Sequence, residues 1–248
     1  MRFVPLAITC LALPFAAVAA PSLVNTCQTL SQPGSYVVNK NLASTGDCIV
    51  IASDFVTLDL DGFVISGGGT GVGAGVTELR EQGFRGITVR NGTITKFAHA
   101  IQLSRSTGVT VERIHATANA DDAISVGDMS TVRSSVAIAN GRDGIRLGQR
   151  GLVTGSNAEE NGGAGIRVDI GGNVIGNTVG RNKLSGISTV EGANVINNVS
   201  RNNALYGVFM DCPGLFMGNA ASNNGSSAAD NFKDVSGGCV VNEHNSTL

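Results

Sequence analysis

The chain has 248 residues, including 34 glycines, nine phenylalanines, two tyrosines and no tryptophan. Its hydrophobic fraction of 42% and charged fraction of 15% exclude an intrinsically disordered chain, which would have the opposite balance. The net charge of -2 and the scarcity of aromatic side chains argue against a nucleic-acid partner. Abundant Val, Ile, Gly and Asn favour an all-β protein with many short strands and tight turns.

Residues 1–19 have the features of a secretory signal peptide. A basic Arg2 is followed by the largely apolar run Phe3–Phe15 and by the small-residue site Ala17–Ala19. We predict cleavage at the end of this segment, which leaves residues 20–248 as a single domain. Later apolar stretches are too short for a membrane span, so we expect the mature protein to be soluble and extracellular or periplasmic.

Four cysteines remain after this cleavage, near the two ends of the mature chain. An oxidising compartment favours disulfides over metal ligation, and four cysteines allow three pairings. Cys27 and Cys48 are 21 residues apart, and Cys212 and Cys239 are 27 apart. We therefore expect Cys27 to bond to Cys48 and Cys212 to Cys239, which places one staple at each end.

The segment between Ser66 and Gly86 is predicted to be an inserted loop between two strands. Its glycine-rich part, Gly69–Ala74, fits a relaxed dinucleotide fingerprint, but no βαβ pattern surrounds it, so we interpret it as a loop. Thr77–Gln82 is predicted to form a short helical turn inside the insertion.

From residue 111 onward, three columns of residues recur every 21 positions. Two are apolar and one is asparagine, and a further polar column runs beside them. The columns are Val111, Val132, Val153, Val174 and Val195; Ile124, Ile145, Ile166 and Ile187; Asn119, Asn140, Asn161, Asn182, Asn203 and Asn224; and Ser135, Ser156, Asn177, Asn198 and Asn219.

A period of 21 is typical of a solenoid in which each repeat is one coil that buries its apolar face against its neighbours. Apolar runs of two to four residues between Gly and Asn indicate strands, so we predict three short parallel strands per coil and about eight or nine coils. The Val and Ile columns should line the interior. The asparagines should occupy left-handed turn positions and hydrogen-bond to one another in a ladder.

Leucine-rich repeats need more leucine, and a left-handed helix of hexapeptides would have a period of 18. The chain instead resembles the right-handed parallel β-helix family of pectate lyases and related carbohydrate-active proteins. The resemblance covers roughly residues 36–240 and includes Cys48–Ile51 and Val56–Gly62, which are similar to the first coils of many secreted members. It implies a right-handed parallel β-helix, and it is weaker for function because one fold hosts many chemistries.

Charged residues that should point outward are concentrated in three coils. The repeat stacks Asp121 with Arg142, Asp122 with Asp143, and Arg146 with Arg167, with Asp169 two residues past Arg167. In similar lyases, Asp-held calcium neutralises a uronate and an Arg removes its C5 proton. The resemblance thus implies Arg146 or Arg167 as the base, Asp121, Asp122 and Asp143 as calcium ligands, and Arg142 and Asp169 as substrate contacts, with Asp169 also a candidate calcium ligand.

Other interpretations remain open at this point. The charges could be a solvated ion-pair patch on a non-catalytic carbohydrate-binding, surface-binding or structural solenoid. The string Asp121–Val126 also resembles the paired-Asp segment of polygalacturonase-type hydrolases, but the sequence has no Gly-His-Gly, and Arg181–Lys183 falls in a turn. An epimerase, which needs a His and a Tyr beside an Asp, is a weaker candidate. The expected partner is a polysaccharide or cell-surface glycan, bound by a monomer.

Overall fold

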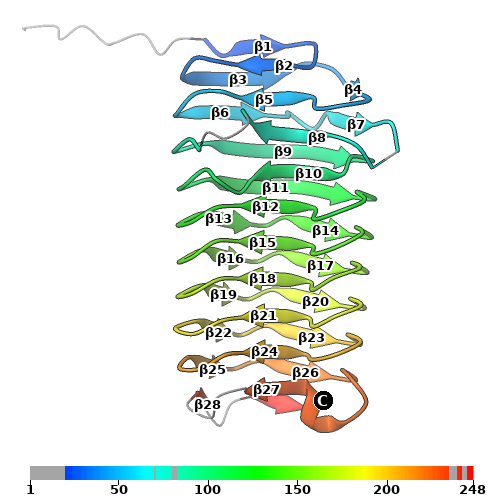
Figure 1. Cartoon of the computed structure of the whole chain (residues 1–248), viewed down its shortest axis with the longest axis vertical. Helices are drawn as coiled ribbons and strands as arrows, with labels where there is room; N and C mark the ends of the chain where they lie inside the picture. The colour runs from blue at the N-terminus through cyan, green and yellow to red at the C-terminus, as the bar shows by residue number, and fades with distance from the viewer. Residues whose placement is uncertain (1–19, 70, 80–82, 235–238, 242–244, 248) are drawn as a thin grey trace, which may run out of the picture.

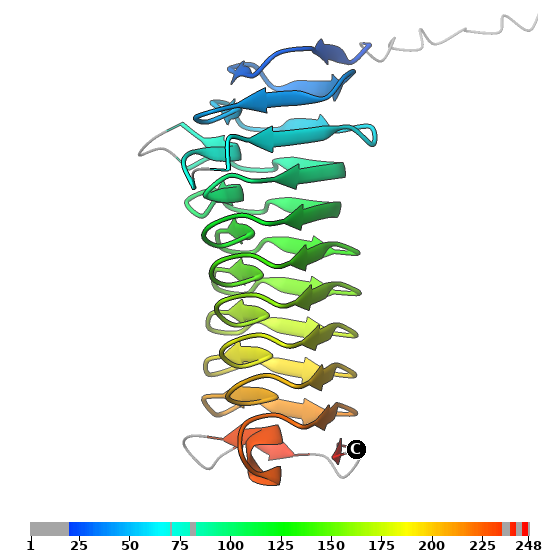
Figure 2. The ribbon, with the colours of Figure 1, turned by 90° about the vertical axis from the view of Figure 1, so that its right-hand side faces the viewer.

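The computed structural model describes residues 20–69, 71–79, 83–234, 239–241 and 245–247 (Figure 1). The predicted signal peptide, residues 1–19, lies outside this range. The chain winds into a stack of coils in sequence order, with β1 at one end and the C-terminal strands at the other (Figures 1 and 2). The all-β parallel solenoid predicted from the repeat is therefore confirmed.

The coils build two parallel sheets. One contains ten strands, one from each coil: β2 (Gln28–Leu30), β5 (Ile49–Ile51), β8 (Ala74–Glu78), β10 (His99–Leu103), β12 (Ile124–Val126), β15 (Ile145–Leu147), β18 (Ile166–Val168), β21 (Ile187–Thr189), β24 (Val208–Met210) and β27 (Phe232–Asp234). The long strands β9 and β11 of the other sheet pair with two strands each of neighbouring coils, so this sheet forms the remaining two strand positions of a coil.

The second sheet contains 19 strands: β1 (Ser22–Val24), β3 (Gly34–Val38), β4 (Leu42–Ser44), β6 (Val56–Asp59), β7 (Val64–Gly67), β9 (Thr88–Thr95), β11 (Thr110–Thr117), β13 (Thr131–Arg133), β14 (Val136–Ile138), β16 (Leu152–Thr154), β17 (Asn157–Glu159), β19 (Asn173–Ile175), β20 (Thr178–Gly180), β22 (Asn194–Ile196), β23 (Val199–Arg201), β25 (Leu215–Met217), β26 (Ala220–Ser222), β28 (Val240–Val241) and β29 (Ser246–Thr247). The helical content of the described residues is one 3-10 turn, η1 (Ala228–Asn231). In this part of the chain, no helix has the length and apolar character needed to cross a membrane.

The ten strands correct the expected number of coils, which was eight or nine. From β5 to β12 the coils are longer than the repeat, because residues paired between neighbouring strands are 27, 25 and 23 positions apart, whereas from β12 to β24 they are 21 apart. The prediction of a helical turn at Thr77–Gln82 is also wrong for the residues described. Thr77 and Glu78 end strand β8, where they pair with the strands on either side, and Arg80–Gln82 lie outside the described residues.

The apolar columns fill the interior, as predicted. The five valines from Val111 to Val195 and the four isoleucines from Ile124 to Ile187 are 0% exposed. Each is paired in register with its equivalent one coil away, as Val132 is with Val153. Burial of these branched side chains stabilises each coil by about 1.5–3 kcal/mol per residue relative to exposure, and a coil obtains this burial only from its neighbours.

Two ladders of polar side chains run along the corners, as the repeat predicts. In the first, Asn140 donates from its side-chain amide to Asn161 Oδ1 at 3.0 Å, and its backbone N–H donates to the same oxygen at 3.2 Å. The pattern continues to Asn224, whose amide donates to Asn231 Oδ1 at 2.9 Å. The second ladder runs along the Ser135 column and ends on Asn245.

The expectation that the ladder asparagines occupy the left-handed region is wrong. The residue before each one does: Ala139, Glu160 and Arg181 have φ values of 56°, 57° and 55°. The chain reverses at this preceding residue, which leaves the asparagine side chain free to point along the stack. The strain of about 1 kcal/mol or more at each left-handed residue is offset by the ladder bonds that follow it.

Disulfides close both ends with the predicted pairing. Cys27 bonds to Cys48 with a Cα–Cα distance of 4.4 Å, and Cys212 bonds to Cys239 with a Cα–Cα distance of 5.1 Å. Both distances lie within the range that a disulfide spans. The first pair joins the residues just before β2 and β5, which are adjacent strands of the ten-stranded sheet.

Candidate functional site

The outer face of the ten-stranded sheet carries the charged residues that the sequence singles out. In each of the eight strands from β8 to β27, the residues paired in register at one position form what we call the outward row: Thr77, Gln102, Ser125, Arg146, Arg167, Ser188, Phe209 and Lys233. At the corner that leads into these strands lies what we call the charged cluster: His99, Asp121, Asp122, Arg142 and Asp143.

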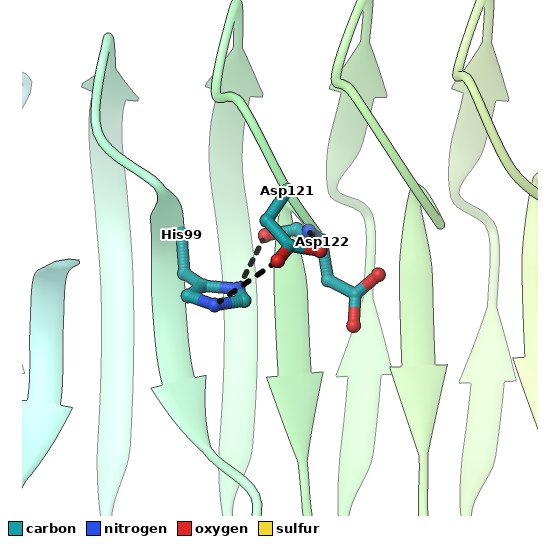
Figure 3. A group of neighbouring side chains, drawn as sticks. All are labelled: His99, Asp121 and Asp122. Atoms are coloured by element: carbon teal, nitrogen blue, oxygen red, sulfur yellow. Dashed lines mark hydrogen bonds and ion pairs between the residues drawn. The ribbon is translucent and has the colours of Figure 1, made fainter. Parts of the chain in front are cut away.

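His99 faces the two aspartates of the next coil (Figure 3). Its Nδ1 lies 3.2 Å from the backbone oxygen of Asp122, and its Nε2 lies 3.8 Å from Asp121 Oδ2. The backbone contact fixes the orientation of the ring, because one ring nitrogen is held while the other faces a carboxylate. Both ring nitrogens of His99 therefore lie against oxygen atoms of the next coil.

Arg142 lies over both aspartates from the following coil. Its Nη1 is 3.0 Å from Asp121 Oδ1, and its Nε is 4.0 Å from Asp122 Oδ1. The charges of Asp122 and then of Asp121, together with the hydrogen bond to Asp121, raise the pKa of Arg142 above its ordinary value. Arg142 therefore stays a cation, which suits it to neutralise carboxylates and not to remove a proton.

Asp122 is 4% exposed, and burial is the main reason that its pKa lies above the ordinary value. The neighbouring carboxylates of Asp143 and Asp121 act in the same direction, while the N–H of Asp143 and the charge of Arg142 oppose them. A carboxyl group with a raised pKa keeps its proton to a higher pH, which is the behaviour that a general acid requires.

Asp122 and Asp143 also hold neighbouring coils together. Asp122 Oδ1 accepts the backbone N–H of Asp143 at 3.0 Å, and Asp143 Oδ1 accepts that of Ala164 at 2.8 Å. Asp47 does the same for Ala74 at 2.9 Å, outside the charged cluster. One oxygen of each of these carboxylates is therefore occupied by the fold itself.

The two arginines proposed as bases have different surroundings. Arg167 Nε lies 3.1 Å from Asp143 Oδ2, although without the alignment of a hydrogen bond. Arg146 is half-buried, and its side chain makes no ion pair or hydrogen bond with any residue that the structure describes. Asp169 is not brought into the charged cluster, because it follows β18 at the opposite end of the strand and lines a separate hollow with Glu191.

Sequence reasoning did not assign a role to His99 or to the pocket beside it. The pocket has a volume of about 420 Å³ and is lined by polar side chains of three consecutive coils. Its lining includes Asp47, Thr77, Glu78, His99, Gln102, Ser104 and Arg105. Glu78 Oε1 accepts the backbone N–H of Arg105 at 2.8 Å, and the Ser106 hydroxyl donates to Glu78 Oε2 at 2.5 Å, which fixes the pocket wall.

A signal for His99 is present in the sequence. The string His99-Ala100-Ile101 matches Asp122-Ala123-Ile124, and the two isoleucines are paired in adjacent strands. Here the spacing is 23 residues, so a count at a fixed period of 21 misses the match.

The donor atoms at this corner are a poor match for calcium. One ligand atom each from His99, Asp121 and Asp122 lie within 4.8 Å of one another, so the group could hold an ion by distance alone. Calcium, however, takes six to eight oxygen ligands, whereas this set contains an imidazole nitrogen. Asp121 already faces the guanidinium of Arg142, and Asp122 accepts a backbone N–H. These three residues therefore do not fit a calcium ion.

Comparison with known proteins places these residues on a recognised scaffold. The family described as "Right handed beta helix region" matches residues 29–203. No curated protein matches the sequence significantly.

Several solved structures share the fold. The A-module of the Azotobacter vinelandii mannuronan C-5 epimerase AlgE6 has a TM-score of 0.55 at 18% identity, over 79% of this chain and 62% of that one. Pectate lyase Pel9A has a TM-score of 0.52 at 14% identity, over 88% and 72%. The Dettilon tailspike protein has a TM-score of 0.54 at 13% identity, over 92% and 54%. The chain therefore spans less than two thirds of the epimerase module, and at these identities the likeness shows a common fold alone.

Proposed function

Because the chain belongs to the right-handed β-helix family, we propose that it is a secreted carbohydrate-active protein that binds a uronate-containing polysaccharide along the outward row and removes the C5 proton of a bound uronate. Its predicted signal peptide and its two disulfides support export. The similar structures include a mannuronan C-5 epimerase and a pectate lyase, which supports a polysaccharide substrate.

The observation that carries the proposal is the state of Arg146. It stands in the outward row without an ion pair among the described residues, one coil from Arg167 and beside the charged cluster. An unpaired guanidinium in a row of polar side chains can bind a planar carboxylate in a bidentate manner or lie against the reacting carbon.

In the proposed reaction, the uronate carboxylate is neutralised first, since the C5 proton becomes acidic only when the negative charge beside it is offset. Arg167 and Arg142 each lie beside an aspartate at the charged cluster and are suited to this binding role. Arg146 is our proposed base. His99 is the alternative base, because histidine is the side chain that most often acts as a general base and the Asp122 backbone oxygen holds its ring in place.

Loss of the C5 proton can lead to either of two products. In a β-elimination, the C4–O bond breaks, a C4=C5 double bond forms, and the leaving oxygen takes a proton. In an epimerisation, a proton returns to the opposite face of C5. A lyase is our leading reaction. His99 beside Asp121 favours an epimerase more than the sequence alone did, but Tyr206 lies four coils beyond Asp122, about 19 Å along the axis.

One experiment tests the shared step. The mature protein is incubated with polygalacturonate and with alginate in deuterated water, and deuterium at C5 is read by nuclear magnetic resonance while the unsaturated product is read by absorbance. We expect uptake of deuterium or appearance of the double bond, and its loss in Arg146→Ala. Arg201→Ala is the matched control, because Arg201 is an exposed arginine of the other sheet with no ion pair in the described chain.

Two further variants separate the two bases. If His99 is the base, His99→Ala abolishes exchange through a loss of kcat, whereas Arg146→Ala mainly raises KM. If Arg146 is the base, the loss falls on kcat in Arg146→Ala. Full activity in both variants would contradict the catalytic proposal.

A non-catalytic binding solenoid is the second candidate, and a specific observation favours it. Asp122 and Asp143 each use an oxygen to hold the next coil, and Asp143 also lies beside Arg167. These are structural roles that need no substrate. Binding of uronate polymers without exchange or elimination under the conditions above would select this candidate.

A further inference from the structure

The three columns at this face change their chemistry along the axis. The column of Asp121 and Arg142 continues through Gly163 and ends in two leucines, Leu184 and Leu205. The outward row of Arg146 and Arg167 continues through Ser188 to Phe209, and Tyr206 occupies the position equivalent to Asp122 four coils earlier. Charged coils thus give way to apolar and aromatic coils on one continuous surface.

Tyr206 and Phe209 form a stacked pair at the apolar end. Their ring centroids are 5.5 Å apart and the rings are inclined by 24°. Both side chains are half-buried, and beside them Leu205 is 45% exposed. The Tyr206 hydroxyl has no hydrogen-bond partner in the described part of the chain. Rings that served only the core would face inward, as Val208 and Met210 do at 0% exposure.

A hollow opens beside the tyrosine ring. It has a volume of about 330 Å³ and is lined by Leu205, Tyr206, Ser226 and Asp230, with Ala204 and Gly225 at its edge. Its wall combines apolar side chains with polar groups that can orient a bound ring. Asp230 is held by the N–H groups of Ser226 and Ser227, so the polar side of the hollow is fixed in place.

Positive charge lies on both sides of the aromatic pair. Arg167 is two coils before Phe209 in the outward row, and Lys233 is one coil after it. Between the charged cluster and the rings, the column of Asp122 carries the small side chains of Ala164 and Ser185. Phe209 is about 14 Å from Arg146 along the axis, roughly three sugar units of an extended chain.

We propose that Tyr206 and Phe209 form a sugar-stacking subsite for an acidic polysaccharide that lies along the outward row. A sugar ring presents an apolar C–H face that packs on an aromatic ring, and its carboxylate is free to meet Lys233 or Arg167. The subsite rests on the proposed function for its acidic ligand, and it extends the binding surface by about three units beyond the residues assigned to the reaction.

Tyrosine fluorescence can report on this subsite alone. The chain has two tyrosines and no tryptophan, and Tyr36, whose hydroxyl donates to the Gln32 carbonyl oxygen at 2.9 Å, lies in the first coils at the other end. In a Tyr36→Phe protein, the emission therefore comes from Tyr206. We expect this emission to change on titration with oligogalacturonate or oligomannuronate of six units, and not with dimers that occupy only the charged cluster.

Substitutions then test whether the rings hold the sugar. Tyr206→Ala should weaken binding of the six-unit oligomer roughly three- to tenfold by calorimetry and leave dimer binding unchanged. Tyr206→Phe keeps the ring and should bind as the wild type does. Phe55→Ala is the matched control, because Phe55 is a phenylalanine outside the outward row with 64% exposure.

The outcomes separate this subsite from the proposed function. Tight binding of the six-unit oligomer with unchanged emission and unchanged affinity in Tyr206→Ala would overturn the subsite and leave the proposed function intact. If no uronate oligomer binds, the proposed function fails, and the titration is repeated with neutral six-unit oligosaccharides to test the subsite alone. A change of Tyr206 emission with the neutral oligomers supports a stacking subsite for an uncharged chain, and unchanged emission overturns the subsite as well.

Discussion

Replacement of one ladder asparagine tests how the corners hold the coils together. Asn161 is 0% exposed, and its side chain takes part in four hydrogen bonds: two that its oxygen accepts from Asn140, and two that its amide donates to Ala137 O and Asn182 Oδ1. Asn161→Ala removes all four and leaves the backbone N–H of Asn140 buried without an acceptor. That group alone costs about 1–3 kcal/mol, so we expect a total loss of about 3–5 kcal/mol.

The assay compares Asn161→Ala with a matched variant. Asn173 also stands in a column of asparagines, but it is half-buried and accepts a single side-chain bond, from Asn194 at 2.9 Å. We expect Asn173→Ala to lose less than about 1 kcal/mol of unfolding free energy in urea. Hydrogen exchange should also speed up at the Asn140 amide in the first variant. Equal losses in the two variants, or an unchanged Asn140 amide, would refute the reasoning.

Three other predictions follow from the same structure. Because the pKa of the Asp122 carboxyl is raised in the fold, the folded protein binds the carboxyl proton more tightly than the unfolded chain does, and the unfolding free energy should fall as the pH rises from the ordinary to the raised pKa. Asp122→Asn should remove this fall when unfolding is measured from about pH 3 to pH 7, and the same pH dependence in the wild type and the variant would contradict the prediction. Replacing Cys27 and Cys48 with serine should lower the unfolding free energy by about 3 kcal/mol in urea, and an unchanged midpoint would show that this staple does not limit stability. The melting temperatures measured in calcium and in a chelator should agree within about 1 °C, because the donor atoms at the charged cluster do not suit this ion. A clearly higher melting temperature in calcium would show that the protein binds the ion.

Much of the fold could be predicted because the repeat is regular at the interior positions, where burial alone selects the residue type. An interior position of a parallel solenoid accepts only an apolar side chain, so Val132 and Ile145 recur at one spacing and mark the strands. The cysteine pairs could be predicted because their spacing is close to one coil. The residues in the left-handed region could not be predicted, since different residue types such as Glu160 and Arg181 occupy this position in successive coils and no repeated residue marks it.

The charged cluster could be predicted only in part. Asp121, Asp122, Arg142 and Asp143 fall where the repeat is strict, and a count therefore brings them together. His99 belongs to a longer coil, and its place beside Asp121 depends on a pairing that a fixed period does not reach. The backbone role of the two buried aspartates was likewise hidden, because a sequence does not show which oxygen is already in use.

The corner ladders give the solenoid a direction. The backbone N–H of each ladder residue donates to the side chain of the following coil, as Asn182 does to Asn203 and Asn203 does to Asn224. A growing chain that emerges N-terminus first thus completes each coil only when the next one has been made. Among the described residues, Asn231 and Asn245 supply the last acceptors of the two ladders. Each coil therefore gains its full set of corner bonds only when the chain that follows it has been made and folded.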